Sequence, residues 1–163
     1  MLGTNEVPPN ASPATGFTMV SITGNSMMVN VLWSGLIGGP PAVAHIHCCI
    51  AQGNNVGVAV GFPNFPTTLS GNYSHTLDLL DPSIYTSALL NNFGGGTAAG
   101  AEAALIAGLD AGMAYSNIHN STFPGGEIRG FLAPVPEPST VILMMPGLGI
   151  AGMMLRRRIS IRR

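Results

Sequence analysis

Seven short segments of the chain alternate apolar with polar residues, and clusters of Gly, Pro, Asn and Ser separate them. An alternation with a period of two is typical of β-strands that bury one face. The pair Gly24–Asn25 predicts a tight hairpin between the first two segments. So many short strands favour an antiparallel sandwich or barrel over alternating strands and helices. The predicted strands cover residues 17–23, 27–33, 44–50, 56–60, 73–79, 113–119 and 126–132.

The pattern changes between the fifth and sixth predicted strands. Asp81 followed by Pro82 is a typical helix start, and the glycine run 94–96 ends that predicted helix. The alanine-rich residues 98–109 predict a second short helix. We therefore expect a helical insertion in a mainly β domain that covers residues 1–133.

The end of the chain has a different character. Residues 141–155 contain no charged or hydrogen-bonding side chain, and Arg156, Arg157 and Arg158 follow at once. A helix of this length spans roughly 22 Å, less than a hydrocarbon core of about 30 Å, so a buried core helix is the alternative. The arginine block favours a transmembrane helix in the inner membrane with the arginines in the cytoplasm. The body then lies in the periplasm.

Charge separates the same two parts. Only 8% of the residues are charged, and residues 1–134 carry six acids but a single base, Arg129. Because an anionic body is a poor partner for phosphate backbones, we expect no nucleic-acid binding. Residues 1–6 have neither the basic nor the apolar region of an export signal, so we expect a leader upstream of this segment.

Three histidines form the candidate site. His45 and His47 are two residues apart, so both rings lie on one face of a strand, and Cys49 continues that face. His119 lies on a later strand. Two strand histidines and a third from elsewhere can bind zinc or copper, so we predict these three as metal ligands, with Cys49 as a weaker one. In the structural alternative, they hydrogen-bond across strands and pair with Glu127 or Arg129.

Two further pairs are predicted to be structural. Glu127 and Arg129, also two residues apart, predict an ion pair. Adjacent strand residues point to opposite faces, so a disulfide between Cys48 and Cys49 would need a distorted turn. We expect a buried Cys48 and a half-exposed Cys49, with pairing or metal ligation as the alternative. No residue pattern predicts a catalytic group.

The C-terminal segment resembles a PEP-CTERM sorting signal, which would cover residues 134–163. Pro136, Glu137 and Pro138 match its motif, and the apolar run and the arginine-rich end follow in the same order. The resemblance implies a membrane-embedded exosortase as a processing partner, and a cut near the motif. It also implies a Gram-negative bacterium, of a kind that often makes exopolysaccharide.

The body resembles the CHRD domain. Five ordered blocks carry the resemblance, which implies an immunoglobulin-like β-sandwich and no agreed biochemical activity. The histidine pair is also similar to the His-x-His strand of Cu/Zn superoxide dismutases. The blocks are residues 2–9, 33–36, 44–47, 115–119 and 123–132.

Two functions are expected from these patterns. The first is a non-enzymatic module delivered to the cell surface or extracellular matrix, where exopolysaccharide or surface proteins are its partners. The second is a copper- or zinc-binding protein, with superoxide-dismutase-like chemistry as its catalytic form.

Overall fold

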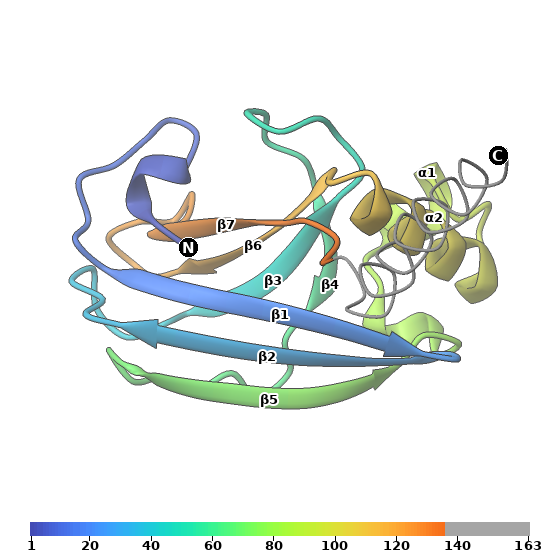
Figure 1. The fold of residues 1–163 in the computed structure, drawn as a ribbon, viewed down its shortest axis with the longest axis horizontal. Helices are drawn as coiled ribbons and strands as arrows, with labels where there is room; N and C mark the ends of the chain where they lie inside the picture. Colours follow the sequence, from blue (N-terminus) through green and yellow to red (C-terminus); the bar gives the residue numbers. More distant parts are fainter. Residues whose placement is uncertain (136–163) are drawn as a thin grey trace, which may run out of the picture.

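A computed structural model describes residues 1–135 of the chain. Seven strands form two antiparallel sheets that face each other, as Figure 1 shows. One sheet has the order β1-β2-β5 and the other β4-β3-β6-β7. The strands are β1 (Thr15–Thr23), β2 (Ser26–Ser34), β3 (Val43–Cys48), β4 (Val58–Gly61), β5 (Gly71–Asp78), β6 (Ala114–His119) and β7 (Ile128–Leu132).

The predicted antiparallel sandwich is therefore confirmed, and all seven predicted strands are present. Strands 1-2-5 and 3-6-7 have the order of strands A-B-E and C-F-G in immunoglobulin domains. The fourth strand pairs with β3 instead of β5. β1 and β2 pair from Thr15↔Ser34 to Thr23↔Ser26, so Gly24 and Asn25 form the predicted hairpin turn, and Gly24 has a φ of 56°.

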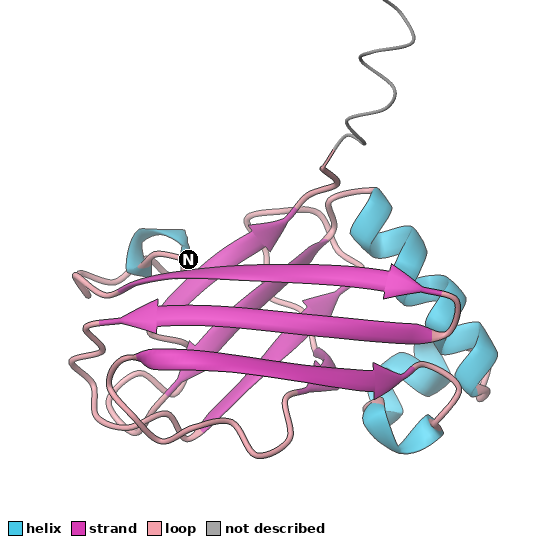
Figure 2. Cartoon of the chain, turned by 60° about the horizontal axis from the view of Figure 1, so that its bottom comes forward, coloured by secondary structure: helices cyan, strands magenta, loops and turns pink. Residues whose placement is uncertain are grey.

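The core lies between the two sheets, whose strands cross in Figure 2. Strand β2 illustrates its origin: alternate side chains are buried, and the intervening ones face outward. Apolar side chains that leave water on folding stabilise the sandwich by roughly 25 cal/mol per Å². The centre of the core contains Met27, Val29, Val31, Trp33, Ile46, Val60, Leu79 and Ile118.

The helices between β5 and β6 lie together at one end of the sandwich (Figures 1 and 2). The expectation of one helix from Asp81 to the glycine run is wrong. Asp81 caps only a short 3-10 turn, η2 (Pro82–Ile84), and accepts a hydrogen bond from the Ser83 N–H. A separate helix, α1 (Ser87–Asn92), begins after Thr86. The helical conformation is interrupted between them because Tyr85 forms a β-bridge with Val60, and its hydroxyl donates a hydrogen bond to the Leu79 carbonyl.

The second predicted helix is present as α2 (Ala98–Asp110), which begins after Thr97, an N-cap that accepts from the Gly100 N–H. A short 3-10 turn, η1 (Gly3–Asn5), precedes β1. Within residues 1–135, no helix combines the length and the apolar character needed to cross a membrane. The predicted transmembrane helix 141–155 and the sorting residues Pro136, Glu137, Pro138, Arg156, Arg157 and Arg158 lie outside the described residues.

Candidate metal centre

The three histidines lie on the outer face of the four-stranded sheet. Ala44, Ile46 and Cys48 of β3 point into the core, so His45 and His47 point away from it. Across the sheet, His45 is paired with Asn117 and His47 with Tyr115 of β6, and His119 ends that strand. The register therefore brings residues more than 70 positions apart in the sequence onto one surface.

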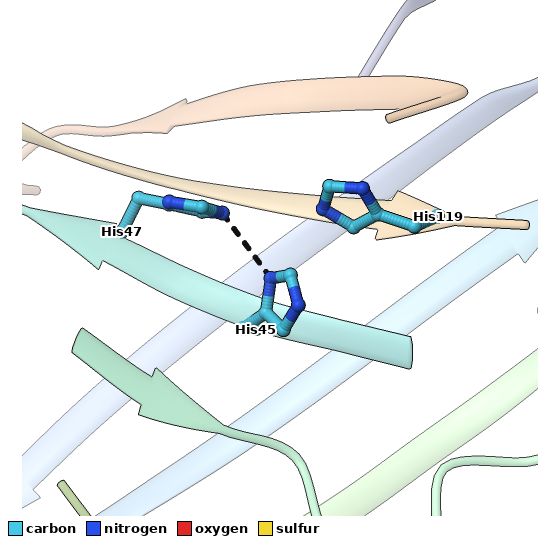
Figure 3. A group of neighbouring side chains, drawn as sticks. All are labelled: His45, His47 and His119. Carbon is cyan, nitrogen blue, oxygen red and sulfur yellow. Dashed lines mark hydrogen bonds between the residues drawn. The ribbon is translucent and has the colours of Figure 1, made fainter. Parts of the chain in front are cut away.

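The predicted ligands converge (Figure 3). One nitrogen from each of His45, His47 and His119 can be chosen so that all three lie within 4.8 Å of one another. His45 Nδ1 lies 3.2 Å from His47 Nε2, and the ring centres of His45 and His119 are 4.6 Å apart. His47 and His119 are buried and His45 is half-buried. The sequence-based prediction that these three residues meet is correct as geometry.

Backbone carbonyls orient two of the rings. His47 Nδ1 donates to the Val56 carbonyl at 2.7 Å, and His119 Nδ1 donates to the Pro124 carbonyl at 2.9 Å. A carbonyl can only accept, so each contact places a proton on Nδ1 and leaves Nε2 as the nitrogen with a free electron pair. This is the arrangement by which proteins fix the tautomer of metal-binding histidines.

The environment favours neutral imidazoles. Burial, with a smaller contribution from the nearby His119 and His47, lowers the pKa of His45 to about 3. Burial also lowers the pKa of His47 and of His119, and the charge of Arg129 contributes to both shifts. Metal ions bind the neutral ring, so the three side chains are in the binding form at neutral pH.

A stack of side chains supports the site on one side. Tyr115 lies parallel to His47, with 4.6 Å between ring centres, and the Arg129 guanidinium lies 3.9 Å from the centre of the Tyr115 ring. Arg129 is 1% exposed and forms an ion pair with Glu6 at 2.9 Å. Its Nη1 donates to the Asn54 carbonyl, and its Nη2 also donates to Asn55 Oδ1.

The predicted ion pair between Glu127 and Arg129 is therefore wrong. Glu127 comes just before β7, and its carboxylate accepts from the Ile37 and Gly38 N–H groups, from the Ser12 hydroxyl and from the Asn120 amide. These bonds tie three loops to the sheet. The structural alternative expected the histidines to pair with Glu127 or Arg129, but both of these residues have other partners.

The cysteines also differ from expectation. Cys48 and Cys49 form a disulfide, and Cys49 adopts a φ of 91°, so the chain turns away from the sheet after Cys48. This is the distorted turn that adjacent cysteines need in order to pair. Cys49 Sγ lies near the Ala104 carbonyl of α2, so this side chain is not brought to the histidines. The fourth histidine, His75, lies on β5 of the other sheet and stacks on Tyr73.

The residues present fit a zinc or copper ion. Metal–nitrogen bonds of about 2.0–2.1 Å in a tetrahedral site separate the donors by about 3.4 Å. The distance of 3.2 Å between His45 Nδ1 and His47 Nε2 is close to this spacing, so binding requires that His45 carries its proton on Nε2 and that His119, which offers a nitrogen within 4.8 Å of both, moves closer. His119 Nε2 lies 2.8 Å from the Asn117 amide, and turning that amide so that its unpartnered Nδ2 faces the ring gives Nε2 a donor. An ion at His119 Nε2 takes the place of this contact.

The residue pattern did not predict the roles of Glu6, Asn54, Asn55 and the Val56 and Pro124 carbonyls. Backbone carbonyls leave no signal in the residue type. For Glu6 the sequence contains a weak signal. Arg129 is the single base among residues 1–134, and a buried arginine requires an acidic partner from elsewhere in the chain.

Comparisons with known proteins agree with both resemblances. The family model of the CHRD domain matches residues 1–132, and that of the PEP-CTERM protein-sorting motif matches residues 134–158. Neither a curated protein nor a solved structure matches the chain. The sorting motif implies export in a Gram-negative bacterium as a membrane-anchored precursor that an exosortase, a membrane enzyme, processes.

Proposed function

Because the chain belongs to the CHRD domain family and carries a PEP-CTERM sorting motif, we propose that it is an exported, non-enzymatic module that binds a zinc or copper ion. His45, His47 and His119 are the proposed ligands. One observation carries the proposal: three imidazoles from two strands offer nitrogens within 4.8 Å of one another, and backbone carbonyls fix the tautomer of two of them.

The ligand chemistry selects the metal class. Imidazole nitrogen suits zinc and copper, whereas magnesium and calcium prefer carboxylate and carbonyl oxygen. Within residues 1–135, no carboxylate joins the group of three histidines. A site of three neutral ligands adds no negative charge of its own, so the ion keeps its full charge and leaves room for a further ligand. Catalysis is not part of the proposal.

The mature body is proposed to reside at the cell surface or in the extracellular matrix, with exopolysaccharide or surface proteins as neighbours. The sorting motif supports delivery across the inner membrane.

Metal analysis of protein exported to the periplasm tests the proposed site. We expect one zinc or copper ion per chain by elemental analysis, and a loss of that ion in the His45→Ala/His47→Ala variant. His75→Ala is the matched control, because it removes a histidine from the other sheet and should retain the metal. Equal metal content in the double variant and the control, or no stoichiometric metal in the unaltered chain, would refute the proposal.

A further inference from the structure

The Cys48–Cys49 disulfide lies directly beside the candidate metal centre. Cys48 follows the ligand His47 at the end of β3, and Cys49 is the first residue of the loop 49–57. We propose that this disulfide is a switch that a dithiol can reduce and that sets the metal affinity of the three histidines. This proposal rests on the function proposed above. The geometry of the loop is the basis for this assignment.

The disulfide fixes the direction in which the loop leaves the sheet. Cys49 has a φ of 91°, a region that residues other than glycine rarely adopt and that costs about 1–3 kcal/mol. The covalent bond to Cys48 holds the backbone there. When that bond is broken, Cys49 can return to an ordinary negative φ, and the first part of the loop changes direction.

The other end of this loop contacts the site. The Val56 carbonyl accepts the His47 Nδ1 proton at 2.7 Å, and the Val56 N–H donates to the Tyr115 hydroxyl at 3.4 Å. Asn54 and Asn55 accept from Arg129, and Asn55 also donates to the Val7 carbonyl. One short loop thus contains both the disulfide and the acceptor that fixes the tautomer of His47.

The surroundings permit reduction. Cys48 is buried, whereas Cys49 is half-buried, so an incoming thiolate approaches the disulfide from the side of Cys49. α2 packs on the pair through Gly108, where an added Cβ would lie 2.2 Å from Cys48 Sγ. A cavity of about 240 Å³ between the start of β4 and α1 adjoins Cys48 and gives its freed side chain space to move.

The reaction is a thiol–disulfide exchange with a dithiol reductant. A thiolate of the reductant attacks Cys49 Sγ, the bond between the two cysteines breaks, and Cys48 leaves as a thiolate that takes up a proton. The second thiol of the reductant then attacks the mixed disulfide and releases Cys49. The reductant is oxidised to its disulfide and supplies both electrons. Loss of an outer partner of a metal-binding histidine typically lowers metal affinity 10- to 100-fold.

The test compares zinc binding by the full chain in detergent with the disulfide intact, reduced or absent. Zinc is the probe because it has no redox chemistry of its own. The reduced sample is prepared with dithiothreitol, which is then removed without air. Because free thiols can bind zinc, the Cys48→Ala/Cys49→Ala variant is the decisive sample, and it should bind zinc 10- to 100-fold more weakly than the oxidised chain. Leu77→Ala, a core change in the other sheet, should bind as the unaltered chain does.

A second measurement needs no metal. Proton NMR of the histidine rings should show a slowly exchanging His47 Nδ1 proton in the oxidised chain and fast exchange in the double alanine variant. If the oxidised chain binds no zinc, the proposed function fails, and the coupling is judged by this exchange alone. Unchanged exchange and unchanged zinc affinity in the double variant, or a disulfide that resists the dithiol, would overturn the switch.

Discussion

Replacing Arg129 by methionine should destabilise the protein severely, because Arg129 is the partner of a buried acid. Arg129 and Glu6 are 1% and 3% exposed and are 2.9 Å apart. Glu6 Oε1 is already buried without a partner. Arg129→Met leaves the Glu6 carboxylate buried and unpaired, and breaking a buried pair in this way costs about 3–5 kcal/mol. Loss of the guanidinium over Tyr115 adds about 0.5–2 kcal/mol.

The pair can be separated from the packing by a second substitution. Glu6→Gln removes the buried negative charge that has no partner in Arg129→Met. The double variant should therefore be more stable than Arg129→Met alone by at least about 1 kcal/mol. Asp110→Asn, which neutralises an exposed acid at the end of α2, is the matched control and should change stability by less than about 0.5 kcal/mol.

The stability lost in Arg129→Met should also depend on pH. Burial raises the pKa of Glu6 to about 6, and Arg129 opposes that rise. Without Arg129 the pKa rises further, so the folded variant takes up a proton above pH 6, where the unfolded chain does not. The free-energy difference between Arg129→Met and the unaltered chain should therefore shrink as the pH falls from 7 to 5.

Urea denaturation followed by the fluorescence of the single, buried Trp33 measures these free energies. Total stabilities of domains are about 5–15 kcal/mol, so the expected loss is easily resolved. A loss below about 1 kcal/mol for Arg129→Met, or a double variant as unstable as the single one, would refute the reasoning.

Two other predictions concern the histidines and the contact between α2 and the disulfide. The pKa of His45 is lowered to about 3, whereas an unfolded histidine titrates near 6.5. The unfolded chain thus binds more protons in this window, so the free energy of unfolding should fall as the pH is lowered through it, and the slope should be shallower in His45→Gln. Gly108→Ala should cost about 1–3 kcal/mol by overpacking, seen as a lower Tm, because the new Cβ meets Cys48 Sγ at 2.2 Å. Gly61→Ala, whose Cβ meets no atom within 4 Å, is the control, and an equal Tm for the two variants would contradict the packing argument.

The strands could be predicted because the alternation of apolar and polar residues reflects the burial of one face of each strand, which is a local property. The break at Tyr85 could not, because its cause is a contact with Val60, 25 residues away in the sequence. Residues 81–94 have the composition of one helix, and only the tertiary partner of Tyr85 divides it. The third strand ends at Cys48 and not at residue 50 because Cys48 forms a disulfide with Cys49, which adjacent residues of a regular strand cannot form.

The candidate site also has one part that the sequence predicts and one part that it does not. The two-residue spacing of His45 and His47 determines a shared face on any strand, and their meeting with His119 followed from a sheet in which β3 pairs with β6. The partner of Arg129 could not be read from spacing. Glu127 has the correct spacing but precedes β7 and is held by N–H groups of the loop at 37–38, which leaves the distant Glu6 to neutralise the arginine.

The exit of the chain from the sandwich sets a spatial limit on its maturation. β7 ends at Leu132, and Val135 is 87% exposed at the end of the described chain. The sorting motif begins at residue 134, only two residues beyond the end of that strand. A membrane enzyme that binds the sorting motif must therefore approach the folded body almost to contact, so the bulk of the β-sandwich near β7 limits the shape of the enzyme that can process it.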